Sequence, residues 1–178
     1  PEHFTVDREL LLRAVRPPLY QPALAAALPA ALHAAAVEGR FEGLFGLSTA
    51  FGSAPGLRLA MGMHFSVMCA EDVPRLGKST DAPGADFRTV DADLYTRVCR
   101  HWPRGDVPAD FYKIPSAPSP VLVMSGGADP ATPPRHGERV ARALAVGHPE
   151  RVRHLVVPES GHGVMAVGCV RDLLFRFI

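Results

Sequence analysis

The chain has 178 residues, of which 47% are hydrophobic and 21% charged, with 19 Lys and Arg against 18 Asp and Glu. This length suffices for a domain with a buried core, and the apolar content excludes a largely disordered chain. A net charge of +1 provides no basic field for nucleic acid. Charged residues and prolines interrupt every apolar run before the roughly 18 residues that a membrane span needs. We therefore expect neither nucleic-acid binding nor a membrane span.

The first part of the chain has the pattern of helices. Residues 6–16 place apolar side chains at helical spacing and end at a Pro-Pro pair. Residues 20–39 are rich in Ala and Leu with an internal Pro29, which predicts two short helices meeting at a kink and ending at Gly39. Residues 41–56 predict a further helix followed by a Gly/Ser loop.

The middle of the chain is less clearly patterned. Residues 57–70 are apolar on both alternating sets, which fits a buried strand or a buried helix, and periodicity does not decide between them. Residues 71–118 are mixed, and a helix over residues 90–101 is their clearest element.

The last sixty residues predict a βαβ unit and a closing helix. Residues 120–130 form a short apolar run ending in Gly-Gly, typical of a strand buried on both faces of a parallel sheet. Thr132 is expected to cap the next helix, residues 153–163 predict a second buried strand with a Gly-flanked turn, and residues 170–178 predict an amphipathic helix. Because two parallel strands need neighbours, we expect this segment to be the edge of a larger doubly wound core whose earlier strands are absent from the sequence.

Two residues with catalytic chemistry follow the two predicted strands. Asp129 lies just past the first strand and His162 just past the second, 33 residues away. Because the carboxyl ends of adjacent parallel strands meet at one edge of a sheet, the two loops should lie side by side. An Asp beside a His fixes the imidazole tautomer and stabilises the imidazolium that forms during general base catalysis. Taken singly, Asp129 also fits an ordinary turn and His162 an exposed loop.

Three cysteines leave two alternatives open. They form no CxxC pair and no zinc pattern. Cys69 and Cys99 are 30 residues apart, and a bridge closing such a loop stabilises a protein by about 3 to 4 kcal/mol. From spacing alone, that bridge and three reduced, buried thiols (Cys169 included) are equally compatible with the sequence.

The segments PVLVMSGGADPATPPRHGERVARAL and HLVVPESGHGVMAVGC carry a family resemblance. Together they resemble the C-terminal end of an α/β-hydrolase of the tripeptidyl-aminopeptidase-like and prolyl-aminopeptidase-like kind, which are secreted bacterial serine hydrolases. Upstream, MHFSVMCAED and CRHWP resemble parts of that family's cap. The resemblance implies an α/β fold, with a mostly helical cap over residues 1–115 and the last two strands and helices of the core over residues 116–178. It also implies a secreted or periplasmic protein.

By this resemblance, Asp129 is the triad acid and His162 the triad base, in the chain order nucleophile, acid, base. The sequence departs from the family because it contains no G-x-S-x-G. The nearest string, GLSTA from Gly46, lacks the last Gly and lies in a helix-like segment, while Ser125 and Ser160 do not follow the elbow pattern. We therefore expect a catalytically incomplete chain that needs an N-terminal half carrying the nucleophile and the oxyanion-hole loop. The start at Pro1, without a leader-like segment, leads to the same expectation of an upstream part.

The resemblance also bears on the cysteines. Extracytoplasmic relatives favour a bridge between Cys69 and Cys99, with Trp102 packed on it. Cys169 is then free or paired with a cysteine of the absent half. Trp102 as a residue that stacks on a ligand is the alternative, and packing is the commoner role of a buried Trp.

Glu71 and Asp72 form the other pair of interest. An exopeptidase must recognise the free ammonium of its substrate, and cap carboxylates do so by charge-assisted hydrogen bonds. Glu71 is the better candidate because it directly follows the apolar segment, and an exposed acidic turn before Pro74 is the alternative. Glu159 is a further acid near His162, but its place before the turn predicts that it points away.

These features predict a serine hydrolase, most simply an aminopeptidase acting on peptides. An esterase or lipase of the same fold is one alternative, with an ester substrate. A binding module that kept the fold and lost its nucleophile is another. Neither a metal nor an organic cofactor is expected.

Overall fold

The computed structural model describes residues 5–52, 59–78 and 90–178. The chain divides into two compact units, one of Pro1–Ala54 with Ile114–Ile178 and one of Pro55–Lys113. The helical first part and the C-terminal strands therefore belong to one unit, and the segment between them forms the other.

Three helices open the first unit. Helix α1 (Arg8–Val15) begins where the Asp7 carboxylate accepts a hydrogen bond from the Leu10 N–H at 2.7 Å. A 3₁₀ turn (Pro17–Tyr20) follows the Pro-Pro pair, as the sequence predicted, and helices α2 (Pro22–Glu38) and α3 (Glu42–Gly52) come next. Their apolar faces meet in a small core of buried residues: Ala14, Leu28, Ala35 and Leu44.

The prediction of two helices between residues 20 and 39 was wrong. Pro29 lies inside the single helix α2. The Ala- and Leu-rich sequence has high helix propensity, and Pro29 is exposed, so water can satisfy the carbonyl that its missing N–H leaves without a bond. Gly39 ends the helix in the left-handed conformation with φ 68°, as its position predicted.

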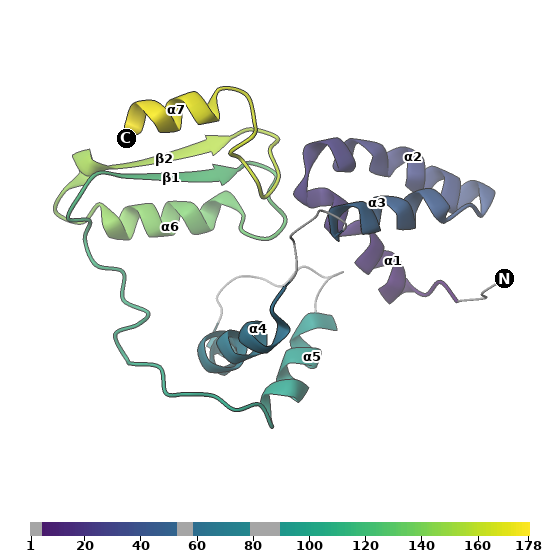
Figure 1. Ribbon diagram of the computed structural model, residues 1–178, viewed down its shortest axis with the longest axis horizontal. Coiled ribbons are helices and arrows are strands. Elements are labelled where there is room, and N and C mark those ends of the chain that lie inside the picture. Colours follow the sequence, from purple (N-terminus) through teal and green to yellow (C-terminus); the bar gives the residue numbers. More distant parts are fainter. Residues whose placement is uncertain (1–4, 53–58, 79–89) are drawn as a thin grey trace. The chain divides into compact units, whose positions relative to one another are not determined.

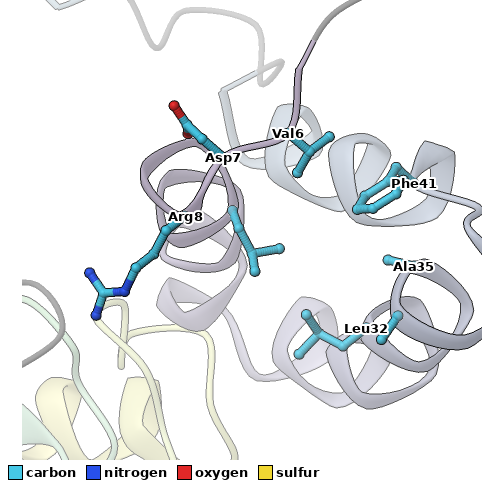
Figure 2. A pocket seen from close by; sticks show the side chains of 8 residues that line it. Val6, Asp7, Arg8, Leu32, Ala35 and Phe41 are labelled. Atoms are coloured by element: carbon cyan, nitrogen blue, oxygen red, sulfur yellow. The ribbon is translucent and has the colours of Figure 1, made fainter.

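An open hollow of about 350 Å³ lies among these helices. Figure 2 shows apolar side chains of Val6, Leu32, Ala35 and Phe41 around it, while the charged ends of Asp7 and Arg8 point away. Neither Asp129 nor His162 lines this hollow.

The C-terminal part of the first unit is a βαβ unit with a closing helix. Strand β1 (Val121–Gly126) pairs in parallel with β2 (Val152–Val157), from Val121 opposite Val152 to Gly126 opposite Val157. Helix α6 (Pro134–Leu144) and helix α7 (Val170–Phe177) lie on opposite sides of this pair (Figure 1). Ala117, Ala141 of α6 and Val152 of β2 form a buried cluster in this part.

The predicted strands and helices of this region are confirmed, with two corrections. The predicted burial of both strands was wrong: most residues of β1 are only half-buried, and Arg153 and Val156 of β2 are exposed, because among the described residues the sheet has only two strands. Thr132 does not cap α6: the cap residue is Pro133, which makes no side-chain capping bond. The hydroxyl of Thr132 is directed to Asp129 instead.

The second unit is helical. It contains α4 (Met61–Val67), a π-helical turn (Met68–Asp72), a 3₁₀ segment (Val73–Lys78) and α5 (Val90–Cys99). The structure thus resolves the ambiguity of residues 57–70 in favour of a helix, although residues 57 and 58 lie outside the described part. The predicted burial was wrong for α4, because Met61 and Met63 are 50% and 65% exposed, and Cys69 after it is buried.

A disulfide joins Cys69 of the π-helical turn to Cys99 at the end of α5. Both cysteines are buried. Cys169 is a free and exposed cysteine. The bridge links the two helical segments of a unit whose described residues bury few large side chains, so we expect it to supply much of that unit's stability.

Replacing Cys69 and Cys99 by Ala should lower the free energy of unfolding by about 3 to 4 kcal/mol, since a closed loop of this length restricts the unfolded chain. Urea denaturation followed by circular dichroism measures the change. Cys169→Ser is the matched control and should unfold within about 0.5 kcal/mol of the unsubstituted chain, because surface substitutions rarely exceed that. Equal stability of the double variant and this control would show that the bridge does not hold the unit together.

Candidate active site

Two loops meet at the carboxyl ends of the parallel strands. The N–H of Gly127 donates to the carbonyl of Val157 at 2.8 Å, and the N–H of Ala128 donates to the carbonyl of Ser160 at 2.9 Å. The loop after β1 is therefore bonded directly to the loop after β2.

Gly126 allows this close approach. A Cβ atom at this position would lie 1.9 Å from the carbonyl oxygen of Gly161 and 2.6 Å from that of Ser160. Both neighbours are backbone atoms, which cannot rotate out of the way as a side chain would. The sequence therefore needs glycine where β1 ends, and the two loops are fixed relative to each other at that point.

The Asp129 side chain is 4% exposed and accepts several hydrogen bonds. Its Oδ1 accepts from the backbone N–H groups of Ala131 at 2.8 Å and Thr132 at 3.0 Å. Its Oδ2 accepts from the Thr132 hydroxyl at 2.8 Å. These donors come from the Asp-Pro-Ala-Thr turn itself, so the local sequence orients the carboxylate before any distant group contributes.

Burial by itself raises the pKa of Asp129, because it disfavours the charged form. The backbone N–H groups of Thr132 and Ala131, the Thr132 hydroxyl and His162 outweigh that effect and lower the pKa below its ordinary value. Asp129 is therefore ionised at neutral pH and acts only as a hydrogen-bond acceptor.

His162 presents one ring nitrogen to this carboxylate. Its Nδ1 lies 3.0 Å from Oδ2 and 3.2 Å from Oδ1 of Asp129. Because an ionised carboxylate only accepts, Nδ1 must carry the proton, which leaves Nε2 as the basic nitrogen. The His162 side chain is 48% exposed, so the imidazole combines a fixed, buried partner with access from outside. The Thr132 hydroxyl lies 3.3 Å from Nδ1.

The structure thus brings together the Asp and His that the strand ends predicted. An arrangement of this kind can accept a proton at Nε2, hold the resulting imidazolium against Asp129 and return the proton to a leaving group. Glu159 is exposed, and the hydrogen bonds of His162 Nδ1 go to Asp129 and Thr132.

Glu71 and Asp72 lie on the π-helical turn of the second unit. The carbonyl of Glu71 accepts a hydrogen bond from the Tyr112 hydroxyl at 2.8 Å, and the Tyr112 ring lies 4.0 Å from the guanidinium carbon of Arg75.

Trp102 contacts the Phe65 ring and donates from Nε1 to the Ser66 hydroxyl at 3.1 Å. Trp102 is partly buried, and these contacts are with Phe65 and Ser66.

The serines considered from the sequence do not occupy an elbow between a strand and a helix. Ser48 of GLSTA lies within helix α3. Ser125 is a buried residue of β1, bonded to His154 Nε2 at 2.9 Å. Ser160 is buried, and its hydroxyl finds no hydrogen-bond partner among the described residues.

Within the described residues, no group of three or more His, Cys, Asp or Glu side chains is arranged to hold a metal ion. The same part of the chain contains no helix with the length and hydropathy that a membrane crossing requires.

The fold and the geometry of the site together indicate the class of protein to which this chain belongs. A parallel strand pair that is flanked by helices, with an Asp and a His at its carboxyl ends, is the arrangement found at the C-terminal end of α/β-hydrolases. Residues 87–178 match the model of the family described as TAP-like protein. This match covers more than half of the chain, and the chain belongs to that family. No curated protein matches the chain, and no solved structure does.

Sequence reasoning missed two residues of the site. Thr132 was interpreted as a helix cap, although its place three residues after Asp129 is typical of a side chain that bonds within a turn. The carbonyl of Tyr20 accepts a hydrogen bond from the His162 N–H at 3.0 Å. No local pattern signals that contact, because the two residues are far apart in the sequence.

Thr132→Val removes one hydroxyl donor from Asp129 and keeps both backbone donors. The pKa of Asp129, measured by carboxyl ¹³C NMR, should rise relative to the unsubstituted chain. The variant should also lose about 1 to 2 kcal/mol of stability at pH 7. Since the folded-state pKa of Asp129 is lowered, the stabilisation exists above the unfolded pKa and disappears as the pH falls through the folded pKa.

The stability difference between Thr132→Val and the unsubstituted chain should therefore shrink towards acid pH. Thr132→Ser retains the hydroxyl and is the matched control, expected to keep the low pKa of Asp129. An unchanged carboxyl titration in Thr132→Val would mean that the hydroxyl does not stabilise the charged form.

Proposed function

We propose that this chain supplies the acid and the base of a Ser-His-Asp triad in a serine hydrolase, most specifically an aminopeptidase. The observation that carries the proposal is the bond between the buried carboxylate of Asp129 and Nδ1 of a half-exposed His162. This bond leaves Nε2 as the nitrogen that can take a proton from a serine hydroxyl.

In the proposed reaction, a serine oxygen attacks the carbonyl carbon of the substrate while His162 Nε2 accepts the hydroxyl proton. Asp129 holds the imidazole in the productive tautomer and stabilises the imidazolium. His162 then gives the proton to the leaving amine as the C–N bond breaks. A water molecule, activated by the same Nε2, hydrolyses the acyl-enzyme and regenerates the serine.

The nucleophile and the oxyanion-hole donors are proposed to lie in a part of the hydrolase outside this sequence. Two observations support this: the sequence contains no G-x-S-x-G, and Ser48, Ser125 and Ser160 occupy a helix interior, a bonded strand position and a buried loop position. On this proposal the chain is catalytically incomplete alone. Residues 1–115 are then the cap, and residues 116–178 are the last part of the hydrolase core.

The substrate class is proposed from Glu71 and Asp72, whose carboxylates suit the free ammonium of a peptide N-terminus. We also propose an extracytoplasmic location. The disulfide between Cys69 and Cys99 supports it, because such bridges persist in oxidising compartments.

A fluorophosphonate probe, which reacts with activated serines, tests the proposed triad. The 178-residue chain should not be labelled, and a longer form that includes an upstream G-x-S-x-G should be. In that longer form, His162→Ala should slow labelling by roughly 10³-fold or more, since an unassisted serine is a poor nucleophile.

His148→Ala is the matched control, because His148 lies 3.3 Å from Glu150 in an exposed pair just before β2, at the end of the strand that does not carry His162. It should leave labelling unchanged. A folded longer form that resists the probe would favour a binding module, and labelling of the 178-residue chain would place the nucleophile within it.

Glu71→Gln in the longer form should raise KM for substrates with a free N-terminal amine by about 10-fold, since a hydrogen bond to a charged group is worth about 1.5 to 3 kcal/mol. It should spare N-blocked esters, which carry no ammonium. Steady-state kinetics on both substrate types measures the difference, with Asp72→Asn as the comparison. Equal effects on the two types would remove Glu71 from ammonium recognition and favour an esterase.

A further inference from the structure

Tyr20 contacts His162 through both its backbone and its side chain. The carbonyl of Tyr20 accepts a hydrogen bond from the N–H of His162 at 3.0 Å. The two rings lie edge-to-face, with centroids 5.3 Å apart and an angle of 67° between their planes. A residue of the helical first part therefore contacts the same imidazole that is bonded to Asp129.

The approach of the two segments is too close for any side chain between them. A Cβ atom on Gly161 would lie 2.2 Å from the carbonyl oxygen of Tyr20 and 3.0 Å from that of Leu19. On its other side, the carbonyl oxygen of Gly161 lies where a Cβ of Gly126 would be. The backbone before His162 is thus packed between the end of β1 and the turn that ends in Tyr20.

The turn that presents Tyr20 is itself well fixed. Pro18 is fully buried, and prolines at the first two positions of the 3₁₀ turn restrict the backbone φ angles. The N–H groups of Leu19 and Gln21 donate to the carbonyls of Arg16 and Pro18 at 3.2 Å each. Tyr20 is therefore presented by a rigid segment between α1 and α2.

A half-exposed imidazole is otherwise free to rotate about χ1, and each rotation breaks the bond to Asp129. We propose that Tyr20 is a positioning residue for His162. Its carbonyl fixes the His162 backbone, and its ring limits the imidazole to the rotamer in which Nδ1 faces Asp129. The inference rests on the proposed function, in which His162 Nε2 is the base, and it assigns to the α1–α2 junction a part in holding that base.

The first test needs no substitution. In the ¹⁵N,¹³C-labelled 178-residue chain, a scalar coupling across the hydrogen bond should join the His162 amide nitrogen to the Tyr20 carbonyl carbon. The imidazole should show a single χ1 rotamer and an Nδ1–H resonance. Absence of the cross-hydrogen-bond coupling in the folded chain would overturn the role of the backbone.

Tyr20→Leu removes the ring and keeps the carbonyl. In this variant we expect rotamer-averaged χ1 couplings for His162 and loss of the Nδ1–H resonance to exchange with water. Tyr20→Phe, which keeps a ring, should restore both signals, and a residue with a purely structural role would not move them. A single rotamer and a retained Nδ1–H resonance in folded Tyr20→Leu would overturn the role of the ring.

If Tyr20→Leu does not fold, the χ1 couplings of His162 in Tyr20→Phe and in the unsubstituted chain test the proposal instead. Rotamer averaging of His162 in either chain would contradict it.

In the longer form, Tyr20→Leu should lower kcat roughly 10- to 100-fold with little change in KM, because a misplaced base affects the chemical step. The NMR measurements require neither a nucleophile nor turnover. They therefore test the positioning role of Tyr20 separately from the proposed hydrolase function. Unchanged kcat in Tyr20→Leu, with a longer form whose activity requires His162, would overturn the positioning role alone. Failure of the proposed function would instead be seen as a folded longer form that the fluorophosphonate probe does not label.

Discussion

The parallel pairing of β1 with β2 determines the rest of the site. In this register Gly126 lies opposite Val157, so the two strands end at the same level and their loops begin side by side. A slip of one residue would move every side chain of one strand to the other face. It would also separate the backbone bonds between Gly127 and Val157 and between Ala128 and Ser160. The distance between Asp129 and His162 therefore follows from the strand register.

The local turn after β1 orients the Asp129 carboxylate. A buried carboxylate is costly unless hydrogen bonds compensate for its lost hydration. Asp129 receives two of these from the backbone of its own turn and one from Thr132, so it is ionised and oriented before His162 contributes. A carboxylate that is already fixed needs little rearrangement when a neighbouring imidazole becomes charged. A general base needs this preorganisation in the group bonded to it.

Much of this was predictable because the signals are local. The apolar runs before Asp129 and His162, their glycines and the crossover spacing place both residues at neighbouring strand ends without any structure. The failures have equally physical causes. A proline without an N–H predicts a kink at Pro29, but an exposed proline is tolerated within the Ala-rich helix α2. Thr132 fits two local patterns, a helix cap and a side chain that bonds within a turn. Its hydroxyl bonds to Asp129, because a hydrogen bond to a buried, charged carboxylate is stronger than one to a neutral backbone group. Tyr20 gave no signal, since a contact between distant segments depends on tertiary packing rather than on periodicity.

Membership of the TAP-like family and the Tyr20 contact together bear on how an α/β-hydrolase uses its helical segments. The family match begins at residue 87, so Tyr20 lies outside the matched region while contacting a residue within it. Asp129 and Thr132 both contact the imidazole at Nδ1, and bonds to a single ring nitrogen leave rotation about that nitrogen open. A second contact on another side of the ring removes that freedom, and Gly161 is the residue that permits it by leaving room for the Tyr20 backbone. The turn that ends in Tyr20 therefore contacts His162 directly, which ties the orientation of this imidazole to the packing of α1, α2 and α3.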